Sequence, residues 1–202
     1  MIRNILFDMG GVLLRFEPQT FIARLGVTGE DAAELERQVF HTVEWVQMDK
    51  GTLTEEEAVA SMCRRLPPRL HGAASELVHH WDEPRLPMPG ATELVRELSD
   101  KGYPLYLLSN AALRHHVYWP KLPMAPYFGD RLMVSADWHL LKPDPAFFQK
   151  ALTMFDLKPE ECLFIDDSTP NVLSAMEQGI AGVVFHGDMA ILRRDLQERG
   201  VL

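Results

Sequence analysis

The chain has 202 residues, of which 47% are hydrophobic and 24% are charged, as in most soluble globular proteins. This length suits one compact domain, or one core that carries a smaller inserted unit. The net charge of −9 argues against nucleic acid or an anionic membrane as the main partner, because both attract basic surfaces. Two cysteines are too few for a disulfide framework and favour a reducing compartment.

The first predicted element is a short apolar run over residues 2–7, which Asp8 and the pair Gly10 and Gly11 follow. Such a run is typical of a buried parallel strand, here one that ends at a carboxylate and turns sharply. No apolar stretch approaches the roughly 20 residues that cross a membrane, and no signal peptide is visible. We therefore expect a soluble, cytoplasmic protein.

Residues from about 17 to 88 lack strand-like runs and have helical patterns throughout. Thr54 and Glu57 form a capping box that predicts a helix extending to residue 65. Prolines then mark a return to the core, at Pro84, Pro87 and Pro89. This segment is predicted to be a helical insert, a cap or lid placed directly after the first strand.

Beyond residue 89, apolar runs alternate with helical patterns. Strands are predicted over 104–108, 131–135, 162–165 and 181–185, and helices over 91–101, 145–155 and 171–178. This alternation predicts a doubly wound parallel sheet in an α/β fold. The core then comprises residues 1–16 and 89–202, with the helical cap at 17–88. Polar residues follow several strands, at the edge where open α/β sheets bind ligands.

Asp8 is a candidate nucleophile. A carboxylate attacks phosphorus to form an aspartyl-phosphate that water later hydrolyses. This chemistry needs a strand end beside a turn tight enough for a phosphate to approach the backbone, and Gly10 and Gly11 supply such a turn. The alternative is that Asp8 only caps a loop.

Asp166 and Asp167 are adjacent acids that follow an apolar strand. Converging carboxylates repel one another unless a cation shares them, and oxygen ligands suit a hard metal ion. Together with Asp8 they predict a Mg²⁺ site that screens the negative charges of nucleophile and phosphate. The alternative is an acidic helix start stabilised by the helix dipole, since a helix is predicted to begin near Asn171.

Three further polar positions are candidates for the same site. Ser109 and Asn110 offer a hydroxyl, an amide and backbone N–H groups at the start of a helix predicted to run through Leu113, which would bind an anion. The same pair could instead serve only as a helix cap. Lys142 lies in a Lys-Pro-Asp-Pro turn, where proline stiffens the loop that directs the ammonium group. Asn171 would hold the metal loop in shape, or would merely begin a helix.

Four segments together resemble the motifs of the haloacid dehalogenase superfamily, in its phosphatase branch with a helical, C1-type cap. They are Phe7-Asp8-Met9-Gly10-Gly11-Val12-Leu13, Leu108-Ser109-Asn110, Lys142-Pro143-Asp144-Pro145 and Phe164-Ile165-Asp166-Asp167-Ser168-Thr169-Pro170-Asn171. The resemblance covers essentially the whole chain. It implies a Rossmann-like core and hydrolysis of a small phosphate ester.

The resemblance also implies a role for each motif residue. Asp8 would be the nucleophile, and Lys142 would neutralise the phosphoryl group. Phosphate would bind to Ser109, Asn110 and Gly11. Mg²⁺ would be held by Asp8, the Gly10 carbonyl and one of the two adjacent acids, with Asp167 preferred over Asp166.

One position departs from the pattern of the superfamily. Most of its phosphatases carry a second aspartate, two residues after the nucleophile, which protonates the leaving alcohol; here that position is Gly10. A general acid typically supplies about 10²–10⁴-fold in rate. Phosphatases that resemble α-D-glucose-1-phosphate phosphatase also have glycine there, which favours a sugar phosphate as substrate. A good leaving group, a water or a cap residue would then replace the acid.

Other readings remain open. Dehalogenases and phosphonatases of the superfamily also lack this aspartate, but dehalogenases generally bind no metal, and phosphonatases need a cap lysine, for which Lys50 is the one candidate. A binding or regulatory protein on a phosphatase scaffold is a third reading. The run 44–51 lies where such caps contribute substrate contacts. The oligomeric state is left open by the sequence.

Two groups of conspicuous side chains are given structural roles. The pairs at 79–80 and 115–116 are histidines without the spacing of a metal site, and we expect them on helix faces or at the surface. We expect a second group to form the core of the insert, namely Trp45, Met48, Met62 and Trp81.

Overall fold

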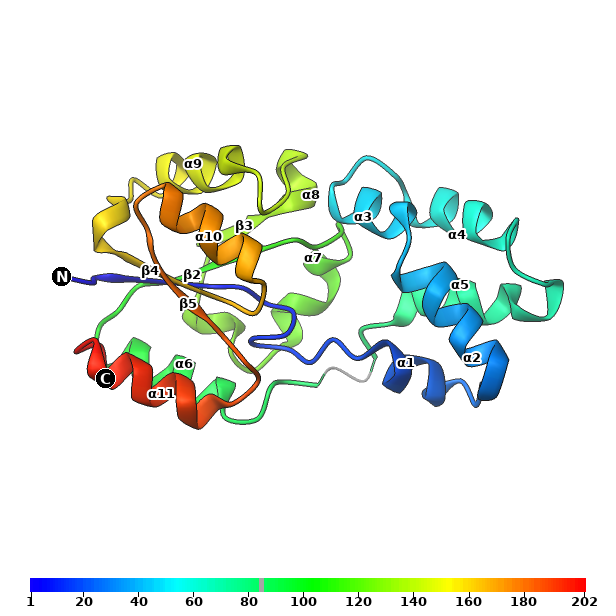
Figure 1. The fold of residues 1–202 in the computed structure, drawn as a ribbon, viewed down its shortest axis with the longest axis horizontal. Coiled ribbons are helices and arrows are strands. Elements are labelled where there is room, and N and C mark those ends of the chain that lie inside the picture. Colours follow the sequence, from blue (N-terminus) through cyan, green and yellow to red (C-terminus); the bar gives the residue numbers. More distant parts are fainter. Residues whose placement is uncertain (84–85) are drawn as a thin grey trace.

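The computed structural model describes residues 1–83 and 86–202. Five parallel strands form one sheet in the order β3-β2-β1-β4-β5, with helices on both faces (Figure 1). The strands are β1 (Asn4–Phe7), β2 (Leu105–Ser109), β3 (Leu132–Val134), β4 (Cys162–Asp166) and β5 (Ala181–Val184). Their bounds lie within one or two residues of the predicted ones. The doubly wound α/β fold is thereby confirmed.

Strand β1 lies at the centre of the sheet, between β2 and β4, and all four of its residues are buried. Because successive side chains point to opposite faces, Leu6 packs in one hydrophobic cluster while Ile5 and Phe7 pack in another. This arrangement explains why the strand is a continuous apolar run rather than an alternating one.

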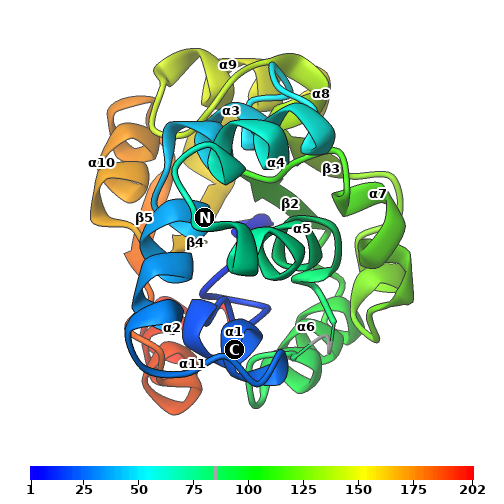
Figure 2. The same ribbon diagram turned by 90° about the vertical axis from the view of Figure 1, so that its right-hand side faces the viewer.

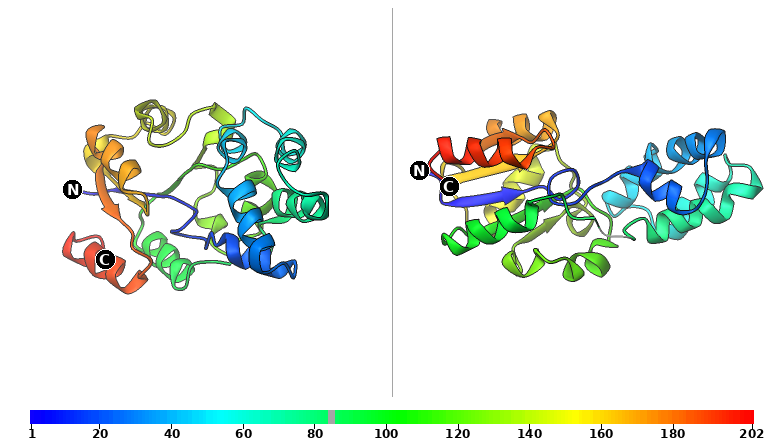
Figure 3. Two further views of the ribbon diagram at one scale, coloured as in Figure 1. Left: turned by 45° about the vertical axis from the view of Figure 1, so that its right-hand side comes forward. Right: turned by 90° about the horizontal axis from the view of Figure 1, so that it is seen from below.

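Four helices cover the two faces of the sheet. On one face lie α6 (Ala91–Asp100) and α11 (Met189–Glu198), and on the other lie α9 (Pro145–Met154) and α10 (Thr169–Glu177) (Figures 1 and 3). Shorter helical segments are α7 (His115–Tyr118), α8 (Ser135–Trp138), Trp119–Lys121, Ala125–Tyr127 and Pro159–Glu161. The helices predicted after residue 89 are therefore present, with one exception.

The exception is the helix predicted to start at Ser109 and Asn110. Residues 110–114 form no helix, and α7 begins only at His115, so this prediction was wrong. Tertiary hydrogen bonds use the groups that a helix start would have used: the Asn110 side chain bonds the backbone of Lys142, and the Ala111 N–H donates to Ser135 Oγ.

Residues 18–80 form a separate group of helices beyond the carboxyl edge of the sheet (Figures 1 and 2). They are α1 (Pro18–Arg24), α2 (Gly29–Leu35), a π-helical turn (Glu36–Phe40), α3 (Val43–Asp49), α4 (Glu55–Cys63), a 3-10 turn (Pro68–Leu70) and α5 (His71–His80). The predicted capping box at Thr54 and Glu57 is present in both directions. Pro84, which was predicted to mark the return to the core, lies outside the described residues. We refer to α1–α5 as the helical insert.

The helical insert has a hydrophobic cluster of its own, distinct from the two clusters that flank the sheet. Met48 and Met62 are buried in it, and Trp45 and Trp81 pack against it, as predicted. His115 was expected on a helix face or at the surface; it lies in helix α7 but is fully buried and stacked on Trp119, with ring centroids 5.5 Å apart. Among the described residues, no helix is long and apolar enough to cross a membrane.

Candidate active site

The predicted site residues come together at the carboxyl edge of the sheet, where the helical insert faces the core. Asp8 directly follows β1, Asp166 is the last residue of β4, and β1 and β4 are hydrogen-bonded neighbours. Parallel strands end at one edge, so residues 158 positions apart in the sequence meet there. This arrangement places both carboxylates beside the loop that carries Lys142.

Lys142 is the best-connected side chain of the site. Its Nζ donates to Asp8 Oδ1 at 2.7 Å, to Asp166 Oδ2 at 2.6 Å and to the Leu108 carbonyl at 2.8 Å. An ammonium group has three N–H donors, and all three are used here. The side chain is 1% exposed, so it is a fixed positive charge rather than a mobile surface lysine.

Asn110 positions the loop of Lys142. Its Nδ2 donates to the Lys142 carbonyl at 2.9 Å, and its Oδ1 accepts from the Lys142 N–H at 2.8 Å. This reciprocal pair ties the end of β2 to the Lys-Pro-Asp-Pro turn. In the structure the Asn110 side chain therefore holds the lysine loop, while its role in phosphate binding stays a prediction.

Both carboxylate oxygens of Asp166 accept hydrogen bonds. Oδ1 accepts from the Ser168 N–H at 2.8 Å, and Asn171 Nδ2 lies 3.1 Å from each oxygen. Together with Lys142, these donors fix an acid that is fully buried. Asn171 thus ties the first turn of α10 to Asp166, and its role in holding a metal loop stays a prediction.

Asp167 is exposed, and its carboxylate lies against the turn after β1. A Cβ atom added at Gly11 would lie 2.3 Å from Asp167 Oδ2, and Gly11 has a φ of +75°. Only glycine combines this close approach with a left-handed conformation at low cost. The Gly11 N–H donates to the Leu14 carbonyl at 2.8 Å, and its predicted contact with phosphate stays a prediction.

One oxygen from each of Asp8, Asp166 and Asp167 lies within 4.8 Å of the others. Three carboxylates and one ammonium leave a formal charge of −2 at the site before any phosphate binds. Burial raises the pKa of Asp8 against the opposing effect of Lys142, and Asp166 raises it further. Burial and Asp166 also raise the pKa of Asp167. Such a set of hard oxygen donors fits Mg²⁺, whose charge would offset this repulsion.

Ser109 is buried at the end of β2, and its hydroxyl makes no hydrogen bond to any described residue. Buried polar atoms nearly always have a partner. An unpaired hydroxyl at this edge is free to bond an anionic ligand. The predicted phosphate contact of Ser109 fits this geometry, although no helix starts there.

A cavity of about 250 Å³ lies between the carboxyl edge of the sheet and the helical insert. Asp8, Lys142 and Asp167 line its floor. Four aromatic side chains from both parts of the chain line its walls, namely Phe16, Trp45, Trp81 and Tyr118. The ring centroids of Phe16 lie 5.8 Å from Trp45 and 5.4 Å from Trp81. The tryptophans therefore both support the insert and line the cavity.

Sequence reasoning missed two charged features of this cavity. Arg114 Nε donates to Glu55 Oε1 of α4 at 2.8 Å, and both residues line the wall. Asp49, the last residue of α3, also lines the cavity. The one signal in the sequence was the position of Asp49 in the run 44–51, where substrate contacts were expected.

Comparison with known proteins identifies related sequences. The chain is 27% identical over 191 residues to a drimenol cyclase from Aspergillus calidoustus, covering 92% of this chain and about a third (34%) of that protein. It is 25% identical to a chloroplast flavin mononucleotide hydrolase of Arabidopsis thaliana, over 80% of this chain and 64% of the relative. It is 24% identical to the 6-phosphogluconate phosphatase of Escherichia coli K12, over 93% and 84% of the two chains.

A similar solved structure is that of a haloacid dehalogenase family enzyme from Bacteroides thetaiotaomicron in complex with magnesium and inorganic phosphate. It has a TM-score of 0.72 and 23% sequence identity, and covers 95% of this chain and 99% of its own. At this identity the similarity concerns the fold. The family model of haloacid dehalogenase-like hydrolases matches residues 2–179, which include every motif of the site. The chain therefore belongs to the haloacid dehalogenase-like hydrolase family.

Proposed function

We propose that this hydrolase is a Mg²⁺-dependent phosphatase that cleaves a small phosphate monoester through an aspartyl-phosphate on Asp8. The observation that carries the proposal is the buried ammonium of Lys142 between Asp8 and Asp166, with Asp167 beside them. This arrangement holds a carboxylate nucleophile next to a set of oxygen ligands for a hard cation. The curated relatives that are phosphatases or phosphate-ester hydrolases support the same class.

In this mechanism, an oxygen of Asp8 attacks phosphorus in line with the departing alcohol oxygen. Lys142 keeps Asp8 oriented and contributes positive charge to the transferring group, and Ser109 offers its unpaired hydroxyl to a phosphate oxygen. Asp8, the Gly10 carbonyl and Asp167 would hold Mg²⁺. Asp166 would lie next to them and keep its hydrogen bond from Lys142. The metal would supply electrostatic stabilisation of the phosphoryl group.

Two other reaction classes receive less support. A phosphonatase needs a cap lysine inside the cavity, but Lys50 is exposed and does not line it. A dehalogenase would gain nothing from the exposed carboxylate of Asp167 beside Asp8, which adds repulsion unless a cation is present. A slow binding protein on this scaffold is the remaining alternative, and activity measurements decide it.

The substrate prediction from the resemblance is a sugar phosphate. A cavity of about 250 Å³ suits a molecule of that size. Its aromatic walls favour a second candidate, a phosphate ester whose organic part is planar or apolar and stacks on Phe16, Trp45 and Trp81. A substrate panel should therefore include sugar phosphates together with aryl, nucleotide and prenyl phosphates.

The test is phosphate release from this panel by the wild type and by Asp8→Asn, each with Mg²⁺ and with a chelator. We expect turnover only in the wild type with metal, because the amide of asparagine is no nucleophile toward phosphorus. Release of halide from a haloacid, or of inorganic phosphate from phosphonoacetaldehyde alone, would refute the proposal. Tight ligand binding without turnover would support the binding protein instead.

A further inference from the structure

The glycine at position 10 leaves the proposed reaction without its proton donor on the core. Gly10 and Gly11 turn the chain two and three residues after Asp8, and neither offers a side chain. A proton donor must lie in the cavity, and its side chain must not already be used in an ion pair or in the proposed metal site. The candidates are therefore the acidic and phenolic side chains that line the cavity.

Asp49 on the helical insert meets these conditions. Resting on the proposed phosphatase function, we propose that Asp49 is the general acid that protonates the leaving oxygen, in place of an acid at position 10. Asp49 ends α3 and lines the same cavity as Asp8 and Lys142. It is partly buried, and the described residues include no cation paired with its carboxyl group.

The other candidates in the cavity are occupied. Glu55 is ion-paired to Arg114 at 2.8 Å, so its carboxylate already has a charged partner. Asp167 lies with Asp8 in the proposed metal site. Tyr118 donates its hydroxyl to Met9 Sδ at 3.7 Å, and burial raises its pKa well above the usual value, which makes it a weak acid.

The environment of Asp49 favours the protonated form. Burial raises the pKa of its carboxyl group to about 8, and the charge of Asp8 adds to this effect, while the backbone of Ala112 opposes it. A carboxyl group that stays protonated near neutral pH can donate a proton to an alkoxide as it forms. Asp8 and Tyr118 are the titratable groups whose charges interact with it from the core.

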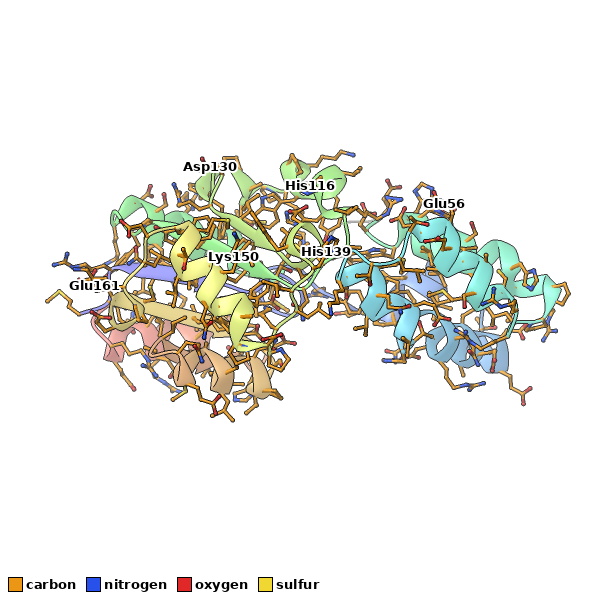
Figure 4. All side chains as sticks on the ribbon, turned by 90° about the horizontal axis from the view of Figure 1, so that it is seen from above. Glu56, His116, Asp130, His139, Lys150 and Glu161 are labelled. Carbon is orange, nitrogen blue, oxygen red and sulfur yellow. The ribbon has the colours of Figure 1, made fainter. Side chains whose placement is uncertain are left out.

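Contacts across the junction fix the end of α3 on the core. Ser135 Oγ donates to the Asp49 carbonyl in a short hydrogen bond, and His139 Nδ1 lies 3.0 Å from the Lys50 carbonyl. Figure 4 shows His139 on the core side of this junction. Gly51 has a φ of +71°, and a Cβ atom added there would lie 2.3 Å from the Ala136 carbonyl oxygen. The insert therefore delivers Asp49 through a close, glycine-dependent contact.

The proton and electron balance of the step is as follows. Asp8 forms a bond to phosphorus, the bond from phosphorus to the ester oxygen breaks, and its electron pair stays on that oxygen. The carboxyl proton of Asp49 moves to this oxygen, which leaves as the alcohol. Asp49 is then a carboxylate that accepts a proton from the water that hydrolyses the aspartyl-phosphate. The bond from phosphorus to Asp8 breaks in this second step, so Asp8 is again a carboxylate and Asp49 is again protonated.

The test is the dependence of kcat/KM on the leaving group. This constant reports the steps up to departure of the alcohol, so Asp49→Asn should affect it most where the leaving oxygen needs a proton. For an alkyl phosphate we expect a loss of about 10²–10⁴-fold, the usual contribution of a general acid. For p-nitrophenyl phosphate, whose phenolate leaves unprotonated, we expect a far smaller loss. The matched control is Asp31→Asn, a surface acid of the same insert that pairs with Arg69.

Three outcomes would overturn the inference. An equal loss for both esters would mean that Asp49 positions the substrate or the insert, and no loss for the alkyl ester would mean that it does nothing in this step. Absence of metal-dependent release from every ester by the wild type and the control would refute the proposed function, and the inference with it. Circular dichroism and the thermal midpoint of Asp49→Asn exclude misfolding as the cause of a selective loss.

Discussion

Replacing Lys142 by methionine tests the physical basis of the site apart from its chemistry. Methionine keeps an unbranched stem of similar length but removes the ammonium that donates to Asp8, Asp166 and Leu108. The two carboxylates then face each other with side-chain exposures of 11% and 0%. Removing one partner of a buried ion pair typically costs about 3–5 kcal/mol. We expect Lys142→Met to lower the free energy of unfolding by that amount at pH 7 without Mg²⁺.

The assay is urea unfolding of wild type and variant between pH 7 and pH 4. Burial and Asp166 already raise the pKa of Asp8 above its ordinary value, against the opposing effect of Lys142, and loss of the ammonium raises this pKa further. The penalty is therefore present at pH 7 and decreases as the pH falls and Asp8 takes up a proton. Lys101→Met, at an exposed position after α6, is the matched control, with an expected change within about 0.5 kcal/mol. A cost for Lys142→Met below about 1 kcal/mol, or one independent of pH, would refute the reasoning.

Three further predictions concern the insert, the metal site and a buried histidine. Gly51→Ala should displace Asp49 by its clash with the core, and so reduce kcat/KM for alkyl phosphates more than for p-nitrophenyl phosphate. Gly11→Ala should push Asp167 away and weaken Mg²⁺ binding, measured by calorimetry, by about 10- to 100-fold; unchanged affinity would exclude Asp167 as a ligand. Burial lowers the pKa of His115 from 6.5 to about 4, so stability is lost as the pH falls from 6.5 toward 4. From pH 7 to pH 5, urea unfolding should show the wild type losing about 2 kcal/mol more than His115→Phe; equal losses would contradict this.

The sheet and the charged cluster were predictable because they depend on local patterns. Strands such as β1 are buried on both faces, so their sequences are continuous apolar runs. Asp8 and Asp166 lie at the ends of two such runs. The strand ends of a parallel sheet share one edge, which placed Asp8 beside Asp166 before any distance was known. Lys142 was predicted as a site residue from another local pattern, the Lys-Pro-Asp-Pro turn in which it lies.

The rest depends on contacts between distant residues. The helix predicted at Asn110 does not form, because Asn110 and Ala111 bond to Lys142 and Ser135 instead. Asp49 gains its position from Ser135, which is 86 residues away, and the sequence marks it only by its place in the run 44–51. The burial of His115 likewise arises from packing on the core.

The central claim is that Asp8 is phosphorylated during turnover, and a rapid-quench experiment tests it most directly. Enzyme in excess over radiolabelled p-nitrophenyl phosphate is mixed with Mg²⁺, quenched in acid at successive times and digested. We predict that the phosphoryl group appears on the peptide that contains Asp8 at the same time as nitrophenol forms, and before phosphate is released. Asp8→Asn should show neither label nor nitrophenol. Phosphate release by Asp8→Asn at the wild-type rate, or label on another residue, would contradict the account.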